Sequence, residues 1–197
     1  MEDQTTNHEL KDRLALIESM MAEGRHSTQR WAWNFLLWGV AYYVAIAWSV
    51  YGKSWMAWPV TMIAAAIVTS VAGSRVRRDK PTTLVGRAIG AVWGVMGTVL
   101  FVVLVTLGLS GRADLHLIVA IAAAMLAVAN GTSSLILRWK MQFACALVWL
   151  ATAVGACLTT EVQLAFLSLA AIFFCQIVFG IYGMILESRR PSGVSHA

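Results

Sequence analysis

Three acidic or imidazole side chains in this sequence are of the types that bind metal ions or transfer protons. They are Asp114, His116 and Glu161, and each stands between two apolar segments. A metal centre or a hydrolytic site needs several clustered His, Cys or carboxylate groups, and one histidine with two carboxylates is a poor set. We therefore interpret them as a solvated rim and predict no catalytic residue, no metal and no cofactor.

The three cysteines offer no redox or metal chemistry. Cys145, Cys157 and Cys175 lie in apolar stretches, are odd in number and show no CxxC spacing. We expect all three to be buried thiols that pack as small hydrophobic residues.

Tryptophan and amide side chains form the remaining candidate site. Trp38, Trp93 and Trp149 recur at separations of 55 and 56 residues, and Asn130 and Gln176 interrupt later apolar segments. Two interpretations are open: these five side chains line a cavity for a small neutral or lipid-like ligand, or they hydrogen-bond between helices and hold a bundle together.

The elements that must position these residues are membrane helices. The chain has 197 residues, of which 59% are apolar and 13% charged, whereas a soluble domain has about a quarter of its residues charged. A membrane helix needs about 20 apolar residues. Six segments qualify, near residues 31–50, 55–73, 87–109, 114–137, 141–159 and 162–186. We predict an all-α polytopic protein of six transmembrane helices, and the tryptophan spacing is consistent with three tandem helical hairpins.

The basic residues predict the orientation of this bundle. Thirteen of the 15 Lys and Arg residues fall in the N-terminal arm, the second and fourth loops or the tail, and only Lys53 and Arg112 fall on the other side. The positive-inside rule then places both termini in the cytoplasm. The same rule accounts for the basic second loop of residues 73–87, so we expect membrane lipid and no nucleic acid among the partners.

The sequence divides into three parts: an arm of residues 1–30, a transmembrane bundle of residues 31–186 and a tail of residues 187–197. In the arm, apolar residues at steps of four, three and four form one helical stripe, which predicts an amphipathic helix. The stripe consists of Leu10, Leu14, Ile17 and Met21. It either packs within the protein or its homo-oligomer, or docks a cytoplasmic regulatory protein.

A glycine stripe opens the third apolar segment. Gly86, Gly90 and Gly94 are four residues apart, a spacing that lets membrane helices approach closely. We expect a helix-packing face there, either inside the bundle or in a dimer.

Two short motifs carry a family resemblance. FLLWG near residue 35 and WPV at residue 58, preceded by IESMM in the arm, resemble a family of small six-span bacterial membrane proteins without an established biochemical role. The resemblance implies a bacterial inner (plasma) membrane, no enzymatic activity and a place beside a cytoplasmic regulator. It assigns no ligand-binding residue.

Two functional hypotheses remain. The first is a non-catalytic membrane protein that self-associates or docks a cytoplasmic partner. The second is a small permease or binder of a neutral or lipid-like ligand. Because no charged residue lies near the middle of an apolar segment, an ion relay has no candidate residues.

Overall fold

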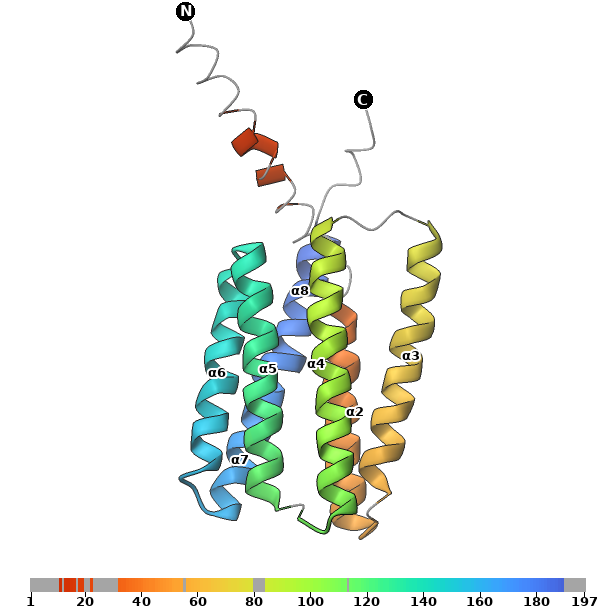
Figure 1. Ribbon diagram of the computed structural model, residues 1–197, viewed down its shortest axis with the longest axis vertical. Coiled ribbons are helices and arrows are strands. Elements are labelled where there is room, and N and C mark those ends of the chain that lie inside the picture. Colours follow the sequence, from red (N-terminus) through yellow and green to blue (C-terminus); the bar gives the residue numbers. More distant parts are fainter. Residues whose placement is uncertain are drawn as a thin grey trace, which may run out of the picture.

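Helices make up nearly all of the described chain in the computed structural model (Figure 1). The structure describes residues 32–54, 56–79, 84–112 and 114–189, together with residues 11, 13–16, 18, 19 and 22 of the arm. Within these ranges no strand occurs.

The helices follow the order of the predicted spans. They are α2 (Ala32–Tyr51), α3 (Ala57–Asp79), α4 (Leu84–Leu109), α5 (Leu115–Leu137), α6 (Lys140–Ala156), α7 (Glu161–Ile172), the π-helix η1 (Phe173–Val178) and α8 (Phe179–Ser188). The last three form one continuous helical segment.

Five helical segments of the described chain are long and apolar enough to cross a membrane, and they indicate a multi-pass membrane protein. They are α2, α3, α4, α5 and the continuous segment Glu161–Ser188. The shorter α6 is also apolar, with 17 residues.

Helix α3 is longer than the sequence predicted. We expected residues 74–79 in a loop, but the helix continues to Asp79. Charged residues are compatible with a helix beyond the bilayer, and residues 74–80 contain no glycine or proline. Pro81 then disfavours helical backbone at the residue in front of it.

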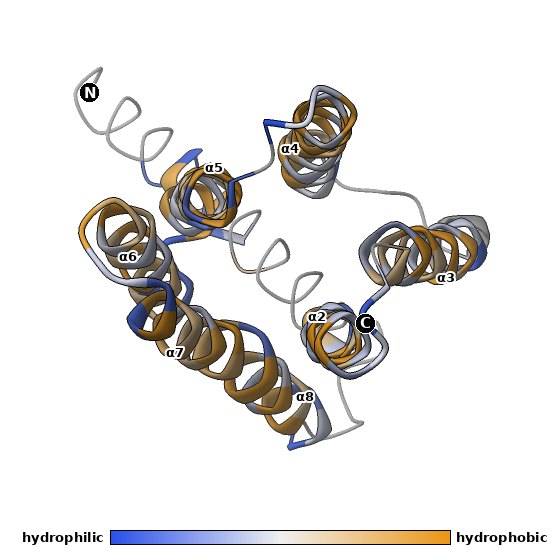
Figure 2. Cartoon of the chain, turned by 90° about the horizontal axis from the view of Figure 1, so that it is seen from below, coloured by the Kyte–Doolittle hydropathy of each residue, from blue (hydrophilic) through white to orange (hydrophobic). Residues whose placement is uncertain are grey.

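Helices α5 and α6 form the tightest pair, joined by a short turn at Arg138 and Trp139. Helix α2 packs on α3 on one side and on η1 and α8 on the other, while α4 packs mainly on α5 (Figure 2). A cluster of buried apolar residues joins α5, α6 and the segment from α7 to α8. We call it the core cluster; it contains Ala123, Leu126, Ala127, Cys145, Trp149, Ala153, Ala171, Ile172, Cys175 and Phe179.

Small residues let α2 and α8 pack closely. A Cβ atom at Gly180 would lie 2.9 Å from the backbone nitrogen of Leu36, and one at Gly183 would lie 2.5 Å from the Cβ of Ala32. A Cβ atom at Gly39 would likewise lie 2.8 Å from the Cβ of Gln176. The close helix approach therefore depends on glycines that the sequence analysis did not select.

The predicted glycine stripe is not an internal packing face over its described length. Nothing lies within 4 Å of a Cβ atom at Gly90 or Gly94, while Gly86 is half-buried. An internal contact was one of two predicted roles, and for Gly90 and Gly94 it is wrong because no described neighbour approaches them. A contact with another molecule stays a prediction.

Two further expectations have mixed outcomes. Cys145 and Cys175 are buried, but Cys157 is exposed, because it lies at the end of α6. In the arm, Leu14 is helical and 58% exposed. The other members of the apolar stripe lie outside the described residues; they are Leu10, Ile17 and Met21.

Candidate functional site

The π-helix η1 keeps one face of the last helical segment turned toward the core. Ala171, Cys175, Phe179 and Gly183 are all buried and repeat at intervals of four residues. In a regular α-helix with 3.6 residues per turn, this spacing would rotate the stripe by about 40° at each step. The wider turn of the π-helix offsets this rotation, so both α7 and α8 bury the same face.

Two of the three predicted tryptophans are hydrogen-bonded in separate helix pairs. Trp38 on α2 donates its indole N–H to Thr69 Oγ1 on α3 at 3.2 Å, and Thr69 donates in turn to Asn34 Oδ1 at 2.7 Å. Trp93 on α4 donates to Ser133 Oγ on α5 at 3.1 Å. Each bond ties two neighbouring helices together.

The structure does not gather the three predicted tryptophans around one cavity. Trp149 belongs to the core cluster and Trp93 packs against it, but Trp38 lies outside it, with its bonded partner on α3. For Trp38 and Trp93, the geometry corresponds to the second predicted interpretation, in which polar groups hold the bundle together.

The other three predicted residues each have a buried polar atom without a hydrogen-bond partner. Trp149, Asn130 and Gln176 are 5%, 1% and 3% exposed. Trp149 Nε1, Asn130 Oδ1 and Gln176 Oε1 have no hydrogen-bond partner among the described residues. Asn130 Nδ2 donates to Leu126 O at 2.8 Å, a hydrogen bond within α5. Buried polar atoms without partners are costly, so these three require an explanation.

The register of the helices brings Asn130 and Trp149 to the same height. A Cβ atom at Gly131 would lie 3.7 Å from the Cβ of Ala146, which fixes the antiparallel pairing of α5 and α6. Asn130 is one residue farther from the connecting turn than Gly131, and Trp149 is three residues farther from it than Ala146. Helical side chains tilt toward the N-terminus of their own helix, so the side chain of Asn130 tilts away from the connecting turn and that of Trp149 tilts toward it. The two side chains therefore end at a similar height along the bundle.

Gln176 approaches the same height from η1. Cys175 Sγ donates to Cys145 O at 3.7 Å, which sets η1 beside the middle of α6. The side chain of Gln176 tilts toward the start of its own segment, and therefore toward the height of Asn130 and Trp149. Its Cβ is covered by Gly39 of α2. We call Asn130, Trp149 and Gln176 the polar triad.

Gln142 is a buried amide that the sequence analysis missed. It is 0% exposed, and neither Nε2 nor Oε1 has a partner among the described residues. The signal that could have selected it is its place on the α6 stripe with Cys145 and Trp149. Its side chain tilts toward the turn at Arg138, away from the polar triad.

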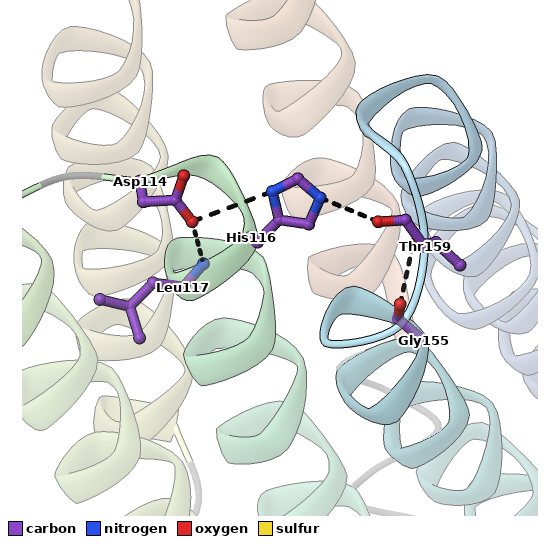
Figure 3. A network of polar contacts seen from close by, with 5 residues as sticks. All are labelled: Asp114, His116, Leu117, Gly155 and Thr159. Atoms are coloured by element: carbon purple, nitrogen blue, oxygen red, sulfur yellow. Dashed lines mark hydrogen bonds and ion pairs between the residues drawn. The ribbon is translucent and has the colours of Figure 1, made fainter.

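The predicted rim residues form a structural contact at the start of α5 (Figure 3). Asp114 Oδ2 accepts from the backbone N–H of Leu117 at 3.1 Å and caps the helix. His116 Nε2 donates to the carbonyl oxygen of Thr159 at 3.1 Å, while its Nδ1 lies 3.9 Å from Asp114 Oδ2. Glu161 has no part in the network drawn, and the described residues contain no group of three or more metal-ligating side chains.

A hollow of about 360 Å³ lies beside this rim, between the start of α5 and α7. Its walls are mainly apolar, with one carboxylate at the edge. They consist of Leu115, Glu161, Val162, Ala165, Phe166 and Leu169. None of these side chains is a nucleophile with a base beside it, so we assign no chemistry to the hollow.

No protein-family model, curated protein or solved structure matches the chain.

Proposed function

We propose that this protein is a non-catalytic, six-span membrane protein of the bacterial inner membrane that self-associates through α4. The observation that carries this proposal is the exposure of α4, because no residue of its membrane-length stretch Val85–Leu109 is buried. Every other membrane-length segment of the described chain buries part of its own stretch. A helix with one packed neighbour leaves most of its surface for lipid or for another protein.

The open glycines support a second copy as the occupant of that surface. Gly90, Gly94 and Gly97 recur at steps of four and three residues and thus share one side of α4. A Cβ atom at any of them would meet nothing within 4 Å. Lipid gives no hydrophobic incentive for helix association, so close backbone packing over small residues is what favours a helix partner over lipid.

The distribution of charge supports the orientation. The ends of α3, α5 and α8 and the starts of α4 and α6 lie at one end of the bundle (Figure 1). That end carries Arg75, Arg87, Arg138, Lys140 and Arg189. In the proposed orientation this end faces the cytoplasm. The arm of residues 1–30 and the tail of residues 187–197 then lie on the cytoplasmic side, where the arm strengthens the homo-oligomer or meets a regulatory protein.

Disulfide crosslinking in native membranes tests the proposal. In a Cys157→Ser background, we expect Gly90→Cys and Gly94→Cys to form disulfide-linked dimers on mild oxidation. The matched control is Val95→Cys, because Val95 is 64% exposed, adjacent in sequence and turned about 100° away around α4. Equal dimer yields at Gly94 and Val95 would indicate random collision and contradict the proposal.

Deletion of residues 1–24 separates the role of the arm from that of α4. If the arm strengthens the oligomer, the deletion lowers the dimer yield of Gly94→Cys without abolishing it. If the arm instead docks a regulator, the yield is unchanged and a soluble protein is lost from mild-detergent pulldowns. Unchanged dimers together with unchanged partners would remove the arm from the proposal.

A further inference from the structure

We propose that the hollow between the start of α5 and α7 binds one acyl chain of a phospholipid with a primary ammonium in its head group, and that Glu161 pairs with this ammonium. The hollow measures about 360 Å³, which is within the usual range of ligand pockets. Its walls are apolar apart from the Glu161 carboxylate. An apolar hollow with one acid at its edge matches a ligand that has an apolar tail and a cationic head.

The length of the hollow matches one leaflet of a bilayer. On α7 it is lined along one side of the helix, from Glu161 at the first position to Leu169. These eight residues rise by about 12 Å, and one leaflet contributes about 15 Å of hydrocarbon. Because Glu161 also begins the membrane-length segment, the hollow extends from the membrane surface through most of one leaflet, as an acyl chain does.

The end of the hollow at the membrane surface is acidic. Glu161 is exposed and forms no ion pair with a described residue. The His116 bond to Thr159 O joins the start of α5 to the turn before α7, and Asp114, with a side chain 66% exposed, adds a second carboxylate at this rim. Arg112, in the turn before α5, pairs with neither carboxylate among the described contacts. Two carboxylates favour a cationic head group and disfavour an anionic one.

The outer wall of the hollow is open toward lipid. Val162 and Phe166 are 67% and 71% exposed, and both belong to the membrane-length segment. A phospholipid chain reaches this opening from within the bilayer, whereas a soluble ligand would first have to leave water. The occupant we propose is therefore a lipid of the bilayer. The inference is independent of α4 and of self-association.

Native mass spectrometry of the full-length protein tests the choice of head group. The protein in mild detergent receives equal amounts of phosphatidylethanolamine, phosphatidylcholine and phosphatidylglycerol with the same acyl chains. We expect phosphatidylethanolamine to be retained about threefold more than either, because phosphatidylcholine has no ammonium proton to donate and phosphatidylglycerol is anionic. Glu161→Gln should remove this preference. Glu18→Gln, the same loss of charge on an exposed residue of the arm, should leave it unchanged. Equal retention of the three lipids by the unmodified protein, or a preference that survives Glu161→Gln, would overturn the proposal.

A second pair of variants tests whether the lipid lies in the hollow. Ala165→Trp fills the hollow from its α7 wall, so we expect the retained phosphatidylethanolamine to be lost. Ala64→Trp is the matched control, because Ala64 is an exposed alanine on α3 and should leave retention unchanged. Photoreactive benzoylphenylalanine in place of Phe166 should crosslink to phospholipid in vesicles of phosphatidylethanolamine and phosphatidylglycerol. Retention that survives Ala165→Trp, or crosslinks from position 166 to a second copy of the chain instead of lipid, would overturn the proposal.

Discussion

At the scale of single residues, the tryptophans of this protein have different structural roles although their side chains are identical. Trp48 near the end of α2 and Trp58 near the start of α3 are both 41% exposed. Such positions are typical of tryptophans at the interface between membrane and water. Trp38 and Trp93 hydrogen-bond to neighbouring helices, and Trp149 packs in the core cluster. The neighbouring helix, more than the residue type, decides which role each indole has.

The Trp93 hydrogen bond predicts a measurable loss of stability. Trp93→Phe keeps an aromatic ring beside Phe35, whose ring centroid lies 5.5 Å away, but removes the donor to the fully buried Ser133. Because Ser133 loses this partner, we expect unfolding to become easier by about 1–3 kcal/mol. Trp48→Phe is the matched control, since an exposed substitution changes the free energy of unfolding by only about 0.5 kcal/mol. SDS titration of both variants measures the difference, and equal effects would contradict the assignment.

The residue scale also shows where sequence reasoning stops. It selected Asn130 and Gln176 because polar groups are rare in apolar segments and Trp149 because of its spacing from Trp38 and Trp93, and all three are buried in the structure. It could not separate them from Trp38 and Trp93, because a hydrogen-bond partner on another helix depends on a register that the sequence does not contain. Gln142 was not selected, and its full burial follows from the packing of α6 against its neighbours, which the sequence does not contain.

At the scale of helices, the positions of the spans were predictable, but their buried faces were not. The predicted segments agree with the helices to within about three residues, apart from the extended end of α3. In a bilayer, residues facing lipid are as apolar as those facing protein, so periodicity does not distinguish the two faces. This is why the Gly86, Gly90 and Gly94 stripe was chosen for packing, while Gly39, Gly180 and Gly183 make the close internal contacts.

Alanine substitutions on the two sets of glycines should have opposite effects. Gly180→Ala would place a Cβ atom 2.9 Å from Leu36 N and 3.2 Å from Ala32 O, so backbone must move. We expect a loss of about 1–3 kcal/mol in the free energy of unfolding. Gly90→Ala meets nothing within 4 Å and improves helix propensity, so we expect a gain of up to about 1 kcal/mol in detergent dilute enough to separate any oligomer. Two losses of equal size would show that Gly90 has an internal neighbour.

The hairpin repeat has partial structural support. In the first two predicted hairpins, the tryptophan of one helix donates to a hydroxyl of the next, from Trp38 to Thr69 and from Trp93 to Ser133. In the third, Trp149 has no described hydroxyl partner. The tightest pair, α5 with α6, also joins two hairpins instead of lying within one. The repeat therefore remains a prediction.

At the scale of the whole molecule, the exposed cysteine gives a test of orientation in the unmodified protein. Cys157 is exposed at the end of α6 opposite the basic end of the bundle, while Cys145 and Cys175 are buried. In the proposed orientation, we expect a membrane-impermeant maleimide to label it from the periplasm. Cys157→Ser should abolish this labelling.

A second label on the same side guards against shielding of Cys157 by lipid. Lys53 is exposed in the turn between α2 and α3, so Lys53→Cys in the Cys157→Ser background should also react from the periplasm. Arg189→Cys, at the end of α8, should react only after the membrane is opened. The reverse pattern would place the basic end outside and would reject the proposed topology.

The π-helix has a consequence for how relatives of this chain should align with it. One extra residue within Phe173–Val178 lets α7 and α8 bury a single face, so a relative with a regular α-helix there needs one residue fewer to keep that face. We expect such relatives to show a one-residue gap between the positions of Ile172 and Phe179, inside an otherwise ungapped apolar segment.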